Sequence, residues 1–406
     1  SPAVAVLQTN APHGSARGSV SAPFKGCYNS DMRVAIDIRM VNEFGVGTHV
    51  WNLVRNLADL DQIHQYFLLG SQRQFLEFGP LGNNFERIDI PEENSFWNLH
   101  IRIPLQLRKH RIDVFHAPHY EAPLLVPCRL VVTIHDCVHL LFPQEGSSKF
   151  DNYRRYLYTK HIVRSANHVI AVSESTRQDI IGIFDLPIAR TSVAHNALDG
   201  RFAEAHSPAE RMRVLERYQL RDPFILYSGQ IKPHKNVDRL IEAFAVLKNE
   251  LGEHKKYKNL KLIIIGDKLS NHQHLRLTVV RSGVQQDVRF FGFVPYPILQ
   301  VFYEAASAFA SPSLYEGFGL PLLEAMAAGC PVLSSKNSAI KEVVGSAGIL
   351  MEADASAEDW SRSLLKVLEC PTLQESLRLA GLAHADKFSW NNCRTQTVEI
   401  LRCVAR

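Results

Sequence analysis

Two glutamates, Glu316 and Glu324, stand eight positions apart in a glycine-containing segment near the end of the chain. Glu316 lies in a loop with Gly317 and Gly319, where the missing side chains let the backbone approach a ligand closely. Carboxylates beside a phosphate site do not bind the phosphate, but they accept hydrogen bonds from hydroxyl groups. The pattern therefore predicts a sugar-phosphate ligand. The alternative interpretation is a capped helix with two surface glutamates.

A short helix is predicted directly after this loop, over about 320–328. Pro321 suits a first helical turn, where its missing N–H costs nothing. Gly329 suits the position after the last turn, and Pro331 blocks continuation. The free N–H groups at the start of the helix favour phosphate. Candidate ligand contacts from this segment are Gly317, Phe318, Gly319, Leu320 and Glu324.

A second polar loop follows a predicted strand that ends near Gly229. It contains Lys235, and Asn236 is predicted to cap the helix that begins next. A cation beside a helix N-terminus neutralises a diphosphate without a metal ion. The alternative for Lys235 is an ordinary solvated loop lysine.

Histidines follow two further predicted strands of the first half, with His116 and His119 after 114–115 and His135 after 130–134. Strand ends of this kind face the ligand site of a parallel sheet. None of these histidines belongs to an HExxH zinc motif. Hydrogen bonding to loop backbone is the alternative to an active-site role. Ser173 opens a helix after the next strand, and capping is its preferred interpretation.

The elements that must position these residues alternate strand with helix, which predicts an α/β fold of two doubly wound, Rossmann-like sheets. The strands are short, apolar and rich in β-branched residues, as buried parallel strands are. We expect a tail over 1–30, a first domain over 31–200, a second over 201–389, and a final helix over 390–406 that crosses back to the first domain. The predicted strands are 34–38, 66–69, 114–115, 130–134, 169–172, 224–227, 262–265, 288–290, 308–310 and 332–334.

The composition of the chain argues against several functional classes of protein. A formal charge of +4 over 406 residues is too mild for a nucleic-acid binder. Seven scattered cysteines without a CxxC indicate a reducing compartment. No apolar run reaches the length of a membrane-spanning helix, and the first residues lack the order of a signal peptide. We expect a cytoplasmic protein without a metal or other cofactor.

The segment around Glu316 and Glu324 resembles the glutamate–seven residues–glutamate signature of retaining GT-B glycosyltransferases, in particular glycosyltransferase family 4. The resemblance covers roughly residues 33–400. It implies a nucleoside-diphosphate sugar as the donor, with Glu316 on the sugar and Glu324 on the ribose. Lys235 matches the family's lysine, but Gln230 replaces its usual arginine, which leaves open whether Lys232 completes the clamp on the diphosphate.

The resemblance extends these roles to other positions. His135, Lys235 and Glu316 become the candidate catalytic residues, and His116, His119 and Ser173 line the cleft or the acceptor site. The glycine loop after the first strand reaches toward the donor phosphate, and residues 292–294 contact the base. Further candidate donor contacts are Gly45, Gly47, Gly229, Gln230, Lys232, Phe293 and Val294.

We therefore expect retaining transfer of a hexose to a hydroxyl of a glycan or lipid-linked acceptor. The overall likeness to bacterial mannosyltransferases of surface-polysaccharide assembly makes mannose from GDP-mannose the first choice. A nucleotide-sugar epimerase and an inactive carbohydrate-binding protein are the alternatives. The basic, amphipathic stretch 96–111 has two interpretations, an ordinary covering helix or peripheral contact with the inner face of the membrane.

Overall fold

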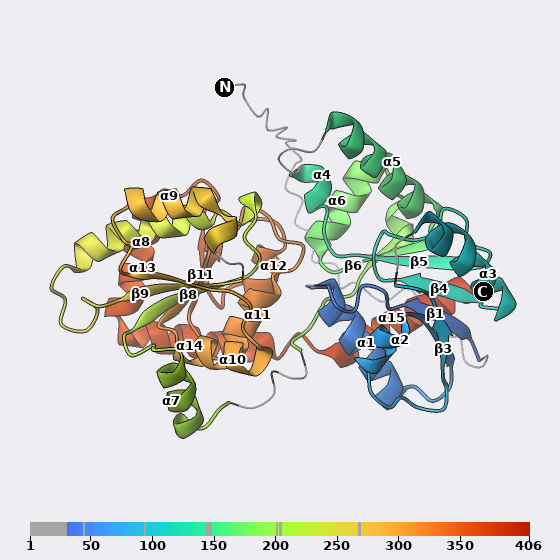
Figure 1. Cartoon of the computed structure of the whole chain (residues 1–406), viewed down its shortest axis with the longest axis horizontal. Helices are drawn as coiled ribbons and strands as arrows, with labels where there is room; N and C mark the ends of the chain where they lie inside the picture. The colour runs from blue at the N-terminus through green and yellow to red at the C-terminus, as the bar shows by residue number, and fades with distance from the viewer. Residues whose placement is uncertain are drawn as a thin grey trace, which may run out of the picture. The chain divides into compact units, whose positions relative to one another are not determined.

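The structure is a computed structural model that describes residues 31–43, 45–92, 95–142, 148–199, 202, 205–266 and 269–406. Asp31–Arg406 form one compact unit, and the tail expected over 1–30 lies outside the described residues. The strands form two parallel sheets with helices on both faces (Figure 1). The predicted fold class, α/β with two doubly wound sheets, is confirmed.

The first sheet has seven strands in the order β3-β2-β1-β4-β5-β6-β7. The sequence predicts five of them but not β3 and β7. Strand β3 lies at the sheet edge and carries three charged residues in five positions, and β7 has only three residues, so neither shows a continuous apolar run. The strands are Arg33–Asp37 (β1), Gln65–Gly70 (β2), Phe85–Asp89 (β3), Val114–Ala117 (β4), Arg129–Ile134 (β5), His168–Ala171 (β6) and Thr191–Val193 (β7).

Helices cover both faces of this sheet because the strands are apolar on both sides. One face packs against α1 (Val46–Leu60) and α15 (Trp390–Ala405). The other packs against α3 (Ile103–Lys109), α5 (Lys149–Ser165) and α6 (Glu174–Phe184). Short helices α2 (Gln72–Leu76) and α4 (Val138–Leu141) lie in the connections.

The second sheet has six strands in the order β10-β9-β8-β11-β12-β13. All five strands predicted in this half are present, and the three-residue β13 is additional. They are Phe224–Ser228 (β8), Lys261–Ile265 (β9), Val288–Phe291 (β10), Ala308–Ser311 (β11), Val332–Ser335 (β12) and Ile349–Met351 (β13). One core cluster joins the sheet to α8 (Val237–Leu251), α9 (Gln273–Arg281) and α13 (Ala357–Glu369). The opposite cluster joins it to α10 (Tyr296–Ala305), α11 (Leu320–Ala327), α12 (Ile340–Val344) and α14 (Pro371–Ala385).

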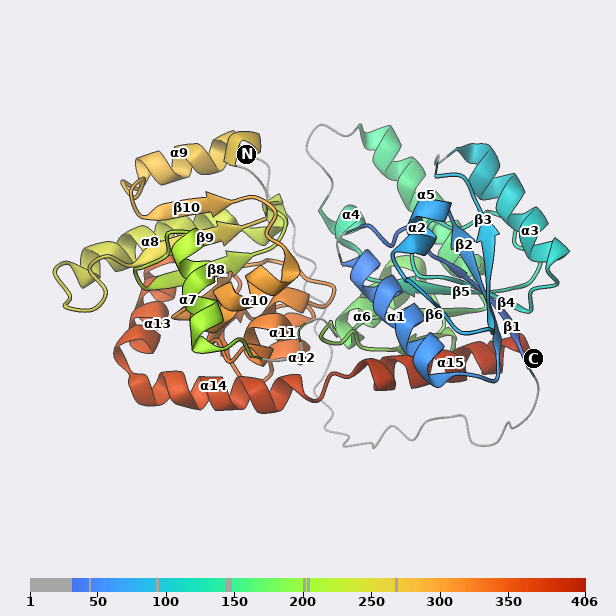
Figure 2. The same ribbon diagram turned by 60° about the horizontal axis from the view of Figure 1, so that its bottom comes forward.

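The last two helices belong to different sheets. Helix α14 packs against α11, whereas α15 lies beside α1 (Figure 2). Trp390, Val398 and Leu401 of α15 are buried in the same cluster as Val34 and Ile36 of β1. The chain thus leaves the second sheet and ends on the first.

Local sequence signals account for several helix boundaries and fail at others. Helix α11 follows Gly319 and ends before Gly329, both at positive φ (94° and 71°), as predicted. The predicted cap at Asn236 is wrong, since its side chain makes no capping hydrogen bond and its backbone is left-handed at φ 52°. Between the last strand of the first sheet and the first strand of the second, Pro208–Arg217 (α7) is helical. The stretch 96–111 contains a π-helical turn, Asn98–Arg102, that leads into α3.

Candidate active site

Each sheet reverses its strand order at one point, between β1 and β4 in the first and between β8 and β11 in the second. Ligands of open α/β sheets bind outside the carboxyl ends of the strands at such points. The loop after β8 carries Lys235 and the loop after β11 carries Glu316, so both motifs lie at the switch point of the second sheet. His116 lies within β4, one residue before its end, and pairs with Ile36 of β1 at the switch point of the first sheet.

Lys235 and Glu316 contact each other directly. The ammonium nitrogen of Lys235 lies 2.6 Å from each carboxylate oxygen of Glu316, and the two side chains are 19% and 13% exposed. Residues 81 positions apart thus form a charge-assisted, two-point contact. Leu314 donates its N–H to the carbonyl oxygen of His234 at 2.7 Å, which ties the two loops together beside the pair.

Glu324 is held by two tyrosines. It is 7% exposed, and its carboxylate accepts hydrogen bonds from the hydroxyls of Tyr296 at 2.6 Å and Tyr303 at 2.9 Å. Burial raises the pKa of both phenols, so each hydroxyl keeps its proton and donates it. Tyr296 and Tyr303 are seven positions apart on α10, which places both on one face of that helix. The sequence reasoning did not name these tyrosines, although that spacing was the available signal.

Gly317 is required by a close approach of two backbones. A Cβ atom at this position would lie 1.8 Å from the carbonyl oxygen of His135, so no other residue fits without movement. The carbonyl oxygen of Gly317 accepts hydrogen bonds from the hydroxyls of Ser173 at 2.7 Å and Thr176 at 3.1 Å. Residues from the two halves of the chain therefore meet at this loop.

Tyr315, next to Glu316, strengthens the same junction. Its side chain is 7% exposed, and its hydroxyl donates to the carboxylate of Asp179 at 2.6 Å. The same hydroxyl oxygen accepts the N–H of Cys137 at 3.3 Å. The loop that carries Glu316 is thus anchored by side chains of α6 and by the segment after β5.

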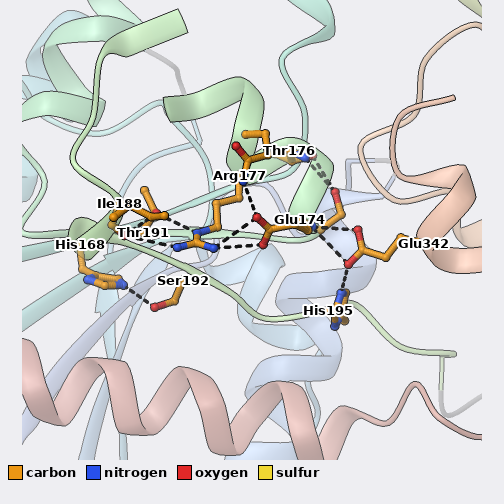
Figure 3. Close-up of polar contacts among 11 residues, drawn as sticks. His168, Glu174, Thr176, Arg177, Ile188, Thr191, Ser192, His195 and Glu342 are labelled. Carbon is orange, nitrogen blue, oxygen red and sulfur yellow. Dashed lines mark hydrogen bonds and ion pairs between the residues drawn. The ribbon is translucent and has the colours of Figure 1, made fainter. Parts of the chain in front are cut away.

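Helix α6 begins at this junction, and Ser173 caps it by accepting the N–H of Thr176 at 3.1 Å. Its role as a helix cap is as predicted from the sequence. Figure 3 shows Glu342 of α12 reaching the N–H of Glu174, at 2.9 Å, and the ring of His195. A carboxylate at a helix N-terminus is stabilised by the helix dipole. This third contact joins the two halves of the chain.

His135 is a neutral imidazole. Burial, followed by the neighbouring His119, lowers its pKa to about 3. Its Nε2 lies 3.0 Å from the carbonyl oxygen of Pro118, which can only accept, so Nε2 carries the proton and Nδ1 keeps a lone pair. The His49 ring packs edge-on against it, with centroids 4.9 Å apart. The tautomer leaves Nδ1 as a hydrogen-bond acceptor.

The other two candidate histidines differ in accessibility. His116 is fully buried, and its Nε2 lies 2.8 Å from the hydroxyl of Thr133, so it does not reach the surface in this structure. His119 is partly buried, its ring lies tilted against that of Tyr120 with centroids 3.9 Å apart, and it accepts the N–H of Glu121. Burial lowers the pKa of His116 to about 3 and that of His119 to about 4, so both rings are neutral near pH 7.

Comparison with known proteins agrees with this arrangement. Residues 45–201 match the family described as Glycosyltransferase Family 4, and residues 210–382 match Glycosyl transferases group 1. The O-antigen chain mannosyltransferase B of Escherichia coli is 34% identical over 294 residues, which cover 72% of this chain and 74% of that protein. This chain is a family 4 glycosyltransferase.

A further sequence relative and two solved structures are similar to different shares of this glycosyltransferase chain. The serotype-specific mannosyltransferase WbdA of Escherichia coli is 31% identical over 68% of this chain but only 33% of that longer protein. The Anabaena protein HepE, solved with UDP and glucose, has a TM-score of 0.71 at 20% identity and covers 92% of this chain and all of that one. WaaG, a glycosyltransferase involved in lipopolysaccharide biosynthesis, has a TM-score of 0.68 at 18% identity and covers 91% and 99%. These structures establish the GT-B fold.

Asp136 is a residue of this glycosyltransferase that sequence reasoning did not single out. Burial raises the pKa of its carboxyl, and the charges of Lys235 and Lys232 oppose that rise. The carboxyl therefore lies within electrostatic reach of the Lys235–Glu316 pair. Its position next to His135 after β5 was the only signal in the sequence.

The remaining predicted donor contacts of the glycosyltransferase lie on the loops of both sheets. Gly45 precedes α1 with φ 75°, and a Cβ on Gly47 would meet the carbonyl oxygen of Val41 at 2.2 Å. Phe318 and Val294 are buried, so their side chains belong to the core, whereas Phe293 is 75% exposed. Lys232 is exposed, while Gly229, Gln230 and Leu320 are partly exposed. Over the described ranges, no set of three or more His, Cys, Asp or Glu side chains is arranged to hold a metal ion.

Proposed function

We propose that this glycosyltransferase transfers a hexose, with mannose from GDP-mannose as the first choice, to a hydroxyl of a glycan or lipid-linked acceptor with retention of anomeric configuration. The observation that carries the proposal is the direct contact between Lys235 and Glu316, since it puts a cation and a hydroxyl-binding carboxylate at one switch point. The relation to an O-antigen chain mannosyltransferase supports mannose. Because HepE was solved with UDP and glucose, a UDP-sugar is the alternative donor to test.

In the proposed reaction, the bond between the anomeric carbon and the diphosphate oxygen breaks, and the acceptor oxygen bonds to the same face of that carbon. The acceptor proton passes to the departing diphosphate. Negative charge grows on that diphosphate, where the Lys235 ammonium and the N-terminus of α11 would stabilise it. The reaction needs no covalent nucleophile from the protein and no metal ion.

Each remaining polar group receives a role in binding. Glu316 would accept hydrogen bonds from hydroxyls of the donor sugar, and Nδ1 of His135 would accept one more. Glu324, already oriented by Tyr296 and Tyr303, would accept from the ribose. Gln230 offers no charge, so Lys235 would neutralise a larger share of the diphosphate than in relatives with arginine there, with Lys232 as the nearest second cation.

The described helices include none long and apolar enough to cross a membrane. We propose that the enzyme acts in the cytoplasm, in peripheral contact with the inner face of the membrane, where a lipid-linked acceptor would be presented.

The test incubates the protein with GDP-mannose or UDP-glucose, first alone and then with lipid-linked glycan acceptors. We expect nucleoside diphosphate release that depends on the acceptor, and an α-linked product by NMR when an α-linked donor is used. Glu316→Gln, which keeps the shape of the side chain, serves as the matched control for background hydrolysis. Conversion of the donor without acceptor would indicate an epimerase, and donor binding without turnover would indicate a carbohydrate-binding protein.

A further inference from the structure

Exposed apolar side chains gather on one part of the first sheet's helical layer. Across the described ranges, twenty large hydrophobic residues are markedly exposed, and ten of them fall between positions 96 and 157. Single exposed apolar residues are ordinary, but a concentration of this kind marks a binding surface. These ten residues are Phe96, Trp97, Ile101, Leu105, Leu124, Leu125, Leu141, Phe150, Tyr153 and Leu157.

Two helical stripes carry most of them. On α5, Phe150, Tyr153 and Leu157 recur at spacings of three and four residues, so they lie on one face, and they are 72%, 59% and 46% exposed. On the turn leading into α3, Trp97 and Ile101 show a comparable spacing, with Leu105 continuing the stripe.

The loop between β4 and β5 connects the two stripes. The N–H of Leu124 donates to His100 at 3.2 Å, and the Leu124 carbonyl oxygen lies 3.0 Å from Nε2 of His161, one turn beyond Leu157 on α5. The Phe96 ring lies 4.6 Å from the His100 ring, centroid to centroid. Leu125, next in the loop, is 80% exposed. Residues 96–105, 124–125 and 150–157 therefore form one surface, here called the aromatic–basic surface.

The helical segments that carry the two stripes extend beyond the aromatic–basic surface and are strongly basic. Residues 95–112 and 149–165 contain nine lysines or arginines and one acidic residue, Asp151, for a formal charge of +8. The whole chain carries only +4, so the rest of the sequence is net negative by four charges. Arg102, Arg108 and Lys109 are exposed on the helix that presents Ile101 and Leu105.

We infer that the aromatic–basic surface is a peripheral docking surface for an anionic lipid bilayer. Exposed aromatic and aliphatic side chains enter the headgroup boundary while surrounding cations bind anionic headgroups. Trp97 and Tyr153 have the amphipathic rings that favour this boundary. A second copy of the chain fits less well, because a two-fold contact would bring together two sets of these basic helical segments, each set with a formal charge of +8 over residues 95–112 and 149–165.

This docking surface rests on the proposed function, since it would bring a lipid-linked acceptor within reach of the enzyme. Binding of the protein to vesicles can nevertheless be measured without donor or acceptor. Sedimentation of the full chain with vesicles of neutral phosphatidylcholine, or of phosphatidylcholine with phosphatidylglycerol, measures it directly. We expect at least tenfold stronger partitioning to the anionic vesicles, weakened by salt because exposed charges are screened over about 10 Å at 0.1 M.

Two variants test the surface itself. Trp97→Ser with Leu125→Ser should lower vesicle partitioning at least tenfold, whereas Leu277→Ser with Leu379→Ser should not, since those exposed side chains lie on α9 and α14. Circular dichroism checks that both double variants fold, and turnover with a water-soluble acceptor should be unchanged in both.

Three results would overturn the inference. These are absence of binding to anionic vesicles, equal binding to neutral ones, and equal loss in the two double variants. A change in oligomeric state on Trp97→Ser with Leu125→Ser, with vesicle binding intact, would assign the surface to a second copy instead. Failure of glycosyl transfer with vesicle binding intact would count against the proposed function alone.

Discussion

Replacing Lys235 by alanine should lower kcat about 100-fold with much less effect on donor binding. In the proposed reaction, the side chain neutralises charge that grows on the diphosphate only as the reaction proceeds, and interactions stronger in the transition state act on kcat. Loss of one such preorganised group typically costs on the order of 10²-fold. Lys232 is exposed and has no comparable contact with a carboxylate in the described residues, so Lys232→Ala is the matched control and should change kcat much less.

The contact with Glu316 adds a second, independent quantity to this prediction. The Glu316 side chain is only 13% exposed, and the Lys235 ammonium lies 2.6 Å from both of its carboxylate oxygens. Lys235→Ala removes that ammonium and leaves the carboxylate unpaired by it. Because the pair keeps some solvent access, we expect a loss of about 1–2 kcal/mol in the free energy of unfolding, below the range for fully buried pairs. In a double-mutant cycle of Lys235→Ala, Glu316→Gln and the variant with both changes, the interaction energy between the two side chains should be about 1–2 kcal/mol.

Saturating-donor kinetics and urea unfolding on these four proteins and Lys232→Ala are the measurements. The reasoning fails if Lys235→Ala raises only KM, or if Lys232→Ala is the more damaging change. Strict additivity in the unfolding cycle would show that the contact between Lys235 and Glu316 contributes nothing to stability.

Further predictions concern nucleotide binding, metal dependence and pH. Glu324→Ala should weaken nucleotide binding by about 1.5–3 kcal/mol, the range for a hydrogen bond to a charged group, and unchanged affinity in calorimetry would contradict the ribose assignment. EDTA should leave turnover intact, whereas complete loss that added metal reverses would contradict the proposed mechanism. Burial holds the pKa of His116 near 3 while an unfolded histidine titrates near 6.5. The unfolded chain therefore binds more protons between these values, and stability falls as the pH falls through that window. His116→Gln should reduce the slope of unfolding free energy against pH below 6 by up to about 1.4 kcal/mol per pH unit, and an unchanged slope in urea unfolding at pH 6, 5 and 4 would contradict this.

Local sequence patterns were sufficient for most of the fold. Ten of the strands follow from short apolar runs, and the boundaries of α11 follow from Gly319, Pro321 and Gly329. These signals are local because backbone conformation and missing N–H groups act within one or two residues. The predictions that failed did so because they, too, used only local signals. Strand β3 pairs on one side only and has no continuous apolar run, and the side chain of Asn236 offers an N-cap that its left-handed backbone does not use.

The candidate site was predictable in its residue types but not in its contacts. The sequence placed Glu316, Glu324 and Lys235 at strand ends and helix starts, and the structure agrees with those positions. It could not show that Lys235 and Glu316 touch, because they are 81 positions apart and meet only where β8 and β11 become neighbours. It also gave no reason to single out Asp136, whose carboxyl pKa is raised by burial and is further influenced by Lys235, Glu316 and Lys232 from the other half of the chain.

Residue chemistry and short-range spacing thus determine which polar groups stand at strand ends and helix starts, where most strands begin, and that two parallel sheets form. Tertiary structure alone decides which of those groups meet. Gly317 illustrates the difference, since its sequence context predicts only a loop whose backbone can approach a ligand closely. In the folded chain, the carbonyl oxygen of His135 occupies the place of a side chain at that position, and Ser173 and Thr176 bind the Gly317 carbonyl from 144 and 141 positions away. Such contacts depend on strand order and helix packing across the whole chain, and no local pattern encodes them.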